Sequence, residues 1–107
     1  MSKSAALALN HIGLTVPDIF GAIDWYDDVF GAAHIMGPRL LQADAKATHE
    51  TPSIFGRQFR RAYQAHLLLA NGVGLELFQF IEPPVQIPEE NMPYWNRGVF
   101  HIAITHP

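Results

Sequence analysis

The sequence predicts an α+β protein in which a strand and a helix precede three more strands, and a linker leads to a last strand. Three observations carry this prediction. An apolar, β-branched run is followed by a pattern of helical period, and two apolar strands flank an Asn-Gly pair. HIGLTVP at residues 11–17 also returns, nearly unchanged, as HIAITHP at residues 101–107. A spacing this long indicates a duplicated module rather than a solenoid array.

The first strand is expected at residues 8–16, because ALNHIGLTV is apolar and Pro17 closes it. Asp18 is then placed to cap a helix through its carboxylate, and Gly31 supplies the left-handed residue that ends one. Between them, four apolar residues recur at helical spacing: Ile19, Ile23, Tyr26 and Phe30.

A weak second strand is expected at residues 33–37, AHIMG, after which the pattern dissolves from Pro38 to Arg61. Connections of more than about 20 residues are uncommon in compact domains and are usually functional or mobile. Two strands at residues 62–70 and 73–80 follow, separated by Asn71 and Gly72.

The length of that turn decides which side chains meet. With a two-residue turn Leu67 faces Glu76, and His66 points to the opposite side of the sheet. With a three-residue turn His66 lies beside Glu76 instead. The sequence leaves both open, so His66 is not included among the expected metal ligands.

The domain organisation follows from these elements. Residues 1–82 form the first βαβββ module, residues 83–97 a linker, and residues 98–107 the first strand of a truncated second module. The linker is assigned because its prolines prevent it from pairing as a central strand: they are Pro83, Pro84, Pro88 and Pro93.

Composition narrows the class of protein. The net charge is −3 and the pI about 6.0, which argues against a nucleic-acid binder, since such a protein needs a basic face. Cysteine is absent and no apolar run approaches a membrane span, so a cytoplasmic protein is expected. Charged residues make up 16% of the chain, below the usual share of about 25%. Contact with a partner chain, or with a missing second half, would explain this deficit, and a homodimer is expected.

His11, His101 and Glu76 are the residues most suited to chemistry. Each histidine shares its strand face with small or weakly polar residues, because alternate residues of a strand point the same way. Glu76 is the single charge in VGLELFQF and shares its face with Phe78. A buried carboxylate without a partner costs several kcal/mol, so an inward Glu76 requires a cation.

Two imidazoles and a carboxylate suit a divalent ion such as Zn²⁺, Ni²⁺, Co²⁺, Mn²⁺ or Fe²⁺. The alternatives are that each histidine is an ordinary core residue and that Glu76 points outward. The repeat favours the metal site, because both copies carry histidine at the same position.

These motifs resemble the vicinal oxygen chelate superfamily, the glyoxalase, bleomycin-resistance and dioxygenase group. NHIGLTVPD with the helix through DWYDDVFGA is similar to the opening of its first module, GLELFQF to that module's fourth strand, and GVFHIAITHP to the first strand of its second. The resemblance implies paired βαβββ modules around a cleft. It also implies that His11, Glu76 and His101 are three of four metal ligands. The fourth, normally a glutamate on the last strand of the second module, has no counterpart in this sequence. A longer protein or a second chain would supply the rest of the barrel.

The function implied is a glyoxalase-I-like lyase or isomerase that moves a proton on a small oxygenated substrate through a metal-stabilised enediolate. Glu76 is expected to be a ligand and, less directly, a group in proton transfer. Arginines and one aromatic residue are the candidates for substrate contact: Arg57, Arg60, Arg61 and Phe78. An extradiol-type dioxygenase with Fe²⁺ and a metal-free, drug-sequestering binding protein are the alternatives. The binder would use aromatic side chains of the cleft: Phe78, Phe80, Tyr94 and Trp95.

Overall fold

The computed structural model describes residues 5–43, 54–89 and 93–107. Residues 44–53 of the long loop expected after Pro38, and residues 90–92 of the linker, therefore lie outside the described residues. The elements are β1 (His11–Thr15), α1 (Ile19–Phe30), β2 (Ala33–Gln42), β3 (Arg61–Leu68) and β4 (Gly74–Glu82).

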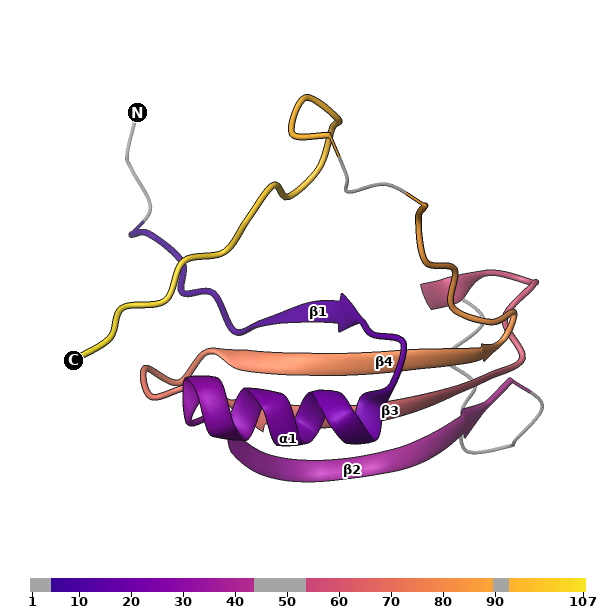
Figure 1. Ribbon diagram of the computed structural model, residues 1–107, viewed down its shortest axis with the longest axis horizontal. Coiled ribbons are helices and arrows are strands. Elements are labelled where there is room, and N and C mark those ends of the chain that lie inside the picture. The colour runs from indigo at the N-terminus through magenta and orange to yellow at the C-terminus, as the bar shows by residue number, and fades with distance from the viewer. Residues whose placement is uncertain (1–4, 44–53, 90–92) are drawn as a thin grey trace.

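The strands form one mixed sheet in the order β1-β4-β3-β2. β1 runs parallel to β4, and the other neighbours are antiparallel. The parallel pair needs a long crossover, which α1 and the β2–β3 hairpin provide. In Figure 1, α1 lies below β1 and the C-terminal segment passes above it. The predicted βαβββ module is confirmed.

Helix α1 ends as expected but begins differently. Gly31 adopts the left-handed conformation (φ 65°), and its N–H bonds the carbonyl of Asp27. Asp18 holds the N-cap position, but its carboxylate makes no cap hydrogen bond, so that prediction was wrong. Instead, the backbone N–H of Ile19 donates to Oε1 of Gln79 on β4, at 2.8 Å. A side chain from the neighbouring sheet thus satisfies one of the first N–H groups of the helix, which have no partner within the helix.

Strand β2 is longer than predicted, because it continues through Pro38 to Gln42. Pro38 was expected to end the pattern, since proline cannot donate to a sheet ladder. In this sheet β2 is an edge strand, and its register with β3 shifts between Met36 and Arg39. Proline is tolerated at an edge and at such an irregularity. The extension brings Arg39 opposite Gln64.

The β3–β4 turn has three residues rather than two. Leu69 N–H donates to the carbonyl of Val73 at 2.9 Å, and Gly72 closes the turn with φ 84°. The register therefore pairs His66 with Glu76. Because opposite residues of an antiparallel pair point to the same face, both side chains project from the sheet together.

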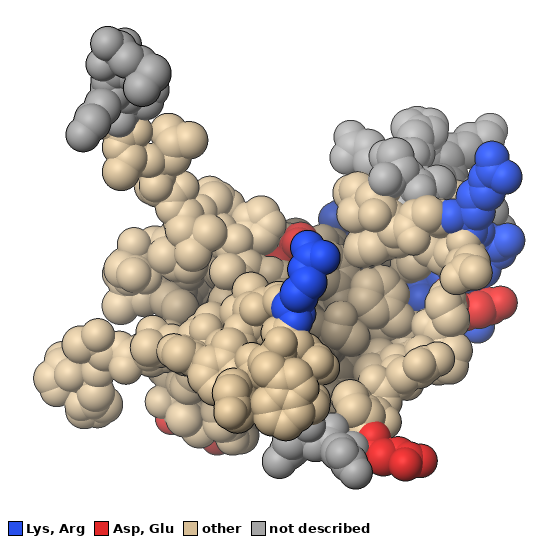
Figure 2. Space-filling model, turned by 90° about the horizontal axis from the view of Figure 1, so that it is seen from above, with Lys and Arg blue, Asp and Glu red and all other residues tan. Residues whose placement is uncertain are grey.

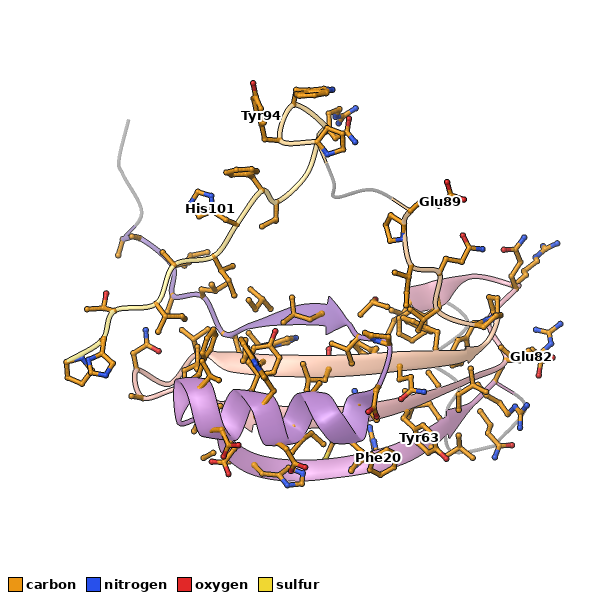
Figure 3. All side chains as sticks on the ribbon, in the orientation of Figure 1. Phe20, Tyr63, Glu82, Glu89, Tyr94 and His101 are labelled. Atoms are coloured by element: carbon orange, nitrogen blue, oxygen red, sulfur yellow. The ribbon has the colours of Figure 1, made fainter. Side chains whose placement is uncertain are left out.

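The two faces of the sheet have different cores. On the helix face, Ile19 and Ile23 of α1 pack against Ala65, Leu67, Leu75 and Leu77. Phe20 and Tyr63 meet edge to face beside this core, with ring centroids 5.7 Å apart (Figure 3). On the opposite face, a smaller cluster contains Leu41, Phe59 and Ala62, with the rings of Phe55, Phe78 and Phe80 against it.

Leu77→Ala is expected to lower the free energy of unfolding by about 2–5 kcal/mol, because Leu77 is fully buried and truncation leaves a cavity. Leu40→Ala is the matched control, since Leu40 on β2 is 43% exposed, and its loss should be no more than about 1 kcal/mol. Urea unfolding followed by tryptophan fluorescence measures both. Equal losses would place Leu77 outside the core.

Residues 98–107 have no strand hydrogen bonding in this structure. Their apolar side chains are exposed, for example Val99 at 80% and Phe100 at 65%. The division of the chain into a module, a linker and the first strand of a second module stays a prediction.

Candidate metal centre

Glu76 is the centre of a polar cluster on the sheet face opposite α1. Its side chain is 18% exposed, and it lies two residues before Phe78 on the same face of β4. The described groups paired with its carboxylate are one amide and two imidazoles, from Gln64, His66 and His11. No lysine or arginine in the described part of the chain forms an ion pair with it.

Gln64 of β3 fixes one oxygen of this carboxylate. Its Nε2 donates to Glu76 Oε2 at 2.7 Å, and its Oε1 accepts from Arg39 Nε at 2.7 Å. A guanidinium can only donate, so the amide oxygen must face Arg39 and the amide NH₂ must face Glu76. Gln64 is 7% exposed and is the one polar residue in the described core.

His66 approaches the same oxygen, with Nε2 at 3.1 Å from Glu76 Oε2. A carboxylate only accepts hydrogen bonds, so this nitrogen carries a proton when the bond is made. A protonated nitrogen cannot ligate a metal. In this arrangement His66 pairs with Glu76 and does not offer this nitrogen to a metal.

His11 faces the other oxygen. Its Cβ lies close over Gly74, since a Cβ built on that glycine would be 3.0 Å away, and the ring reaches diagonally across the parallel pair. Nε2 is 3.7 Å from Glu76 Oε1, and Nδ1 is 2.7 Å from Oδ1 of Asn10. An amide oxygen only accepts, so Nδ1 carries the proton and neutral His11 presents an Nε2 lone pair to the carboxylate.

Two acceptors that face each other need a cation or a proton between them. Zinc–nitrogen and zinc–oxygen distances are each about 2.1 Å, so atoms 3.7 Å apart can contact one divalent ion. A ligating imidazole also commonly donates its other N–H to a nearby oxygen, as His11 does to Asn10. The donor chemistry of His11 and Glu76 therefore fits a divalent metal ion.

His101 is not joined to this pair. It lies on the C-terminal segment above β1, away from β4 (Figure 3). Its ring packs edge to face on Phe100, with centroids 4.9 Å apart. Within the described residues, no group of three histidine, cysteine, aspartate or glutamate side chains is arranged to hold a metal. The structure thus brings together two of the three predicted ligands, and the role of His101 stays a prediction.

The predicted arginines gather at a different place. Arg57, Arg60 and Arg61 border a cavity of about 400 Å³ near the start of β3. Arg61 pairs with Glu82 at 3.5 Å, and Arg60 donates to the carbonyls of Arg57 and Phe59. His66 lies five positions after Arg61 along β3, a span of roughly 16 Å. These arginines are therefore not adjacent to Glu76.

Aromatic side chains occupy the sheet face between these two places. Phe78 and Phe80 stack with centroids 5.7 Å apart, and Phe55 meets both rings edge to face. In Figure 2 the molecule is hollowed in the middle of the view, where one blue and one red group border the hollow, and further charged groups lie toward the right-hand edge. Tyr94 and Trp95 are 70% and 73% exposed on the C-terminal segment.

The comparison with protein families agrees with this architecture. The model of the Glyoxalase/Bleomycin resistance protein/Dioxygenase superfamily matches residues 8–106. The chain belongs to this superfamily. The match covers β1, α1 and the whole sheet, together with the C-terminal segment. No curated protein matches the chain. In the part of the chain that the structure describes, no helix is long and apolar enough to cross a membrane.

Sequence reasoning missed three residues of the cluster: Asn10, Arg39 and Gln64. Gln64 carried a signal, because it is a polar residue in an apolar strand at even spacing from His66. Arg39 carried none, since it follows the proline that was expected to end β2. Asn10 adjoins His11 but resembles an ordinary residue before a strand.

Asn10→Ala is expected to change the tautomer of His11. With Asn10 present, neutral His11 should carry its proton on Nδ1, and removal of the acceptor should increase the population protonated on Nε2. Long-range ¹H–¹⁵N correlation of the imidazoles at mildly alkaline pH measures this. His34, which contacts the carbonyl of Gly37 on β2, is the internal control. Predominant Nε2 protonation of His11 in the unaltered protein would contradict the assignment.

Proposed function

We propose that the protein is a divalent-metal-dependent lyase or isomerase of the glyoxalase type. The observation that carries the proposal is the pair of facing acceptors, His11 Nε2 and Glu76 Oε1, 3.7 Å apart on one sheet face. When bound, the ion supplies Lewis-acid stabilisation of the negative charge that develops on a substrate oxygen. Zinc, nickel, cobalt, manganese and iron are the candidate ions, because the donors are nitrogen and oxygen without sulfur.

His11 and Glu76 would hold the ion, and His101 is proposed as a third ligand that reaches the site when the C-terminal segment approaches β1. Glu76 also has a proposed part in proton transfer, since its carboxylate lies where a substrate oxygen would bind. Gln64 and His66 occupy Oε2, so Oε1 is the oxygen directed toward His11. Asn10 would keep His11 in the tautomer that a metal requires.

A small substrate would rest on Phe78, beside Glu76. The proposed contact of Arg57, Arg60 and Arg61 with an anionic group applies only to a substrate long enough to span roughly 16 Å along the strands. For a shorter substrate these arginines would serve the local structure alone, where Arg61 already pairs with Glu82.

Native mass spectrometry of the protein with each of the five ions tests the proposal. One tightly bound ion, lost in His11→Ala and kept in His34→Ala, is the expected result. The control is matched because His34 is an exposed histidine on another strand. Proton exchange at a carbon beside a substrate carbonyl, followed by NMR in D₂O, would then identify the reaction class.

Two outcomes favour other functions. Binding of iron alone, with oxygen uptake in the presence of a catechol, would indicate the extradiol-type dioxygenase. Absence of any bound ion would favour a metal-free binding protein, a function that the exposed aromatic residues also support. The same spectra report whether two chains associate, and thus test the proposed homodimer. A cytoplasmic location is proposed from composition alone.

A further inference from the structure

The side chains behind Glu76 form a chain of hydrogen bonds across three strands. Arg39 on β2 donates to Gln64 on β3, which donates to Glu76 on β4, each over 2.7 Å. Each bond has one possible direction, since the guanidinium only donates and the carboxylate only accepts. The amide of Gln64 therefore cannot turn over without breaking both bonds.

We propose that Gln64 is a positioning residue: it holds Oε2 of Glu76 so that Oε1 faces His11, and Arg39 keeps the amide in the orientation this requires. The inference deepens the proposed metal site and rests on it. A carboxylate can rotate about its last side-chain bond, and its torsion is broad. The hydrogen bond from Gln64, with His66 Nε2 also 3.1 Å from the same oxygen, restricts that rotation and leaves the other oxygen for the ion.

Burial makes Gln64 suited to this role. It is 7% exposed, so its amide has little water as an alternative partner. A buried amide that loses a hydrogen-bond partner is destabilised by its full desolvation cost. The amide of Gln64 is therefore strongly held in the one orientation that bonds both Arg39 and Glu76. An exposed glutamine would exchange its bonds with water and would not hold the carboxylate in one rotamer.

The first experiment measures the affinity for Co²⁺ by calorimetry in Gln64→Leu, with Gln79→Leu as the matched control. Both glutamines lie in the same sheet and make side-chain hydrogen bonds, but Gln79 accepts from Ile19 on the helix face. We expect the affinity of Gln64→Leu to fall about 10- to 100-fold, the range typical of groups that hydrogen-bond to metal ligands. Gln79→Leu should remain within about threefold. An equal fall in both variants, or in neither, would overturn the proposal.

The second experiment separates the hydrogen bond from metal binding. Gln64→Glu keeps an acceptor for Arg39 but places two carboxylates against each other, so the urea midpoint should fall. The double exchange Gln64→Glu with Glu76→Gln reverses the bond and should restore at least half of that loss. Without this restoration the bond is not formed, and the inference fails.

The third readout needs no metal. In the metal-free protein, Gln64→Leu releases the carboxylate, so the ¹⁵N signal of His11 Nε2 should shift more than in Gln79→Leu. If the unaltered protein binds no Co²⁺, the proposed function fails, whereas this shift and the double exchange still decide the role of Gln64. If Gln64→Leu does not fold, Arg39→Lys replaces it, since a lysine lacks the fixed Nε–H geometry.

Discussion

Glu76→Ala is expected to abolish divalent metal binding while the protein remains folded. The substitution removes Oε1, one of the two facing hydrogen-bond acceptors. His11 Nε2 is then the single described atom of the pair that can ligate a metal. Loss of a ligand should reduce affinity by more than about 100-fold, beyond the range typical of groups that only hydrogen-bond to ligands. The fold should persist because the side chain lies on the face opposite the main core and is reached by water at 18% exposure.

Glu82→Ala is the matched control for this experiment. Glu82 is on the same strand, but its side chain is 57% exposed and pairs with Arg61 at the far end of β4. Exposed pairs contribute about 1 kcal/mol or less, so both metal content and stability should stay close to those of the unaltered protein. Metal content measured by native mass spectrometry that is unchanged in Glu76→Ala would remove Glu76 from the site.

Gly37→Ala is expected to be among the most destabilising single substitutions, lowering the free energy of unfolding by about 3–5 kcal/mol. Gly37 has φ 91°, which a residue with a side chain rarely adopts. A Cβ at this position would also collide with the carbonyl oxygen of Gln64 and lie 2.9 Å from Cα of Ala65. Because these are backbone atoms of the neighbouring strand, β2 and β3 must separate.

Gly56→Ala separates the cost of the positive φ from the cost of the collision with β3. Gly56 has a similar φ of 87°, but no atom lies within 4 Å of the position that a Cβ would take there. Gly56→Ala should therefore lower the free energy of unfolding only by the cost of placing a side chain at positive φ, about 1–2 kcal/mol. Urea unfolding monitored by circular dichroism gives both values. Gly37→Ala should in addition weaken Co²⁺ binding, since it displaces the strand that carries Gln64, and equal losses in the two variants would contradict the collision.

Local patterns predicted most of the fold. The bounds of α1 followed from Ile19, Ile23 and the left-handed Gly31, because helical spacing and a C-terminal glycine are readable within a dozen residues. Strand alternation likewise predicted that Glu76 and Phe78 share a face of β4. These features depend on residues close in sequence.

The pairing register of the strands could not be predicted from the sequence. A change of one residue in the β3–β4 turn moves His66 from one face of the sheet to the other, and the Asn-Gly pair is compatible with either length. The structure has the three-residue turn, and His66 reaches Glu76. The bond from Ile19 N–H to Gln79 at the start of α1 has the same origin, since its acceptor lies 60 residues away in the sequence.

By itself, then, the sequence determined the order of the first five elements, the limits of the helix, and that Glu76 and Phe78 share a face of one strand, because each depends on local periodicity. Tertiary structure alone decided that Arg39, Gln64 and Glu76 form one chain of bonds, and that His101 lies apart from them. These contacts join strands distant in sequence, and the pairing register that creates them depends on turn length and on packing across the whole sheet.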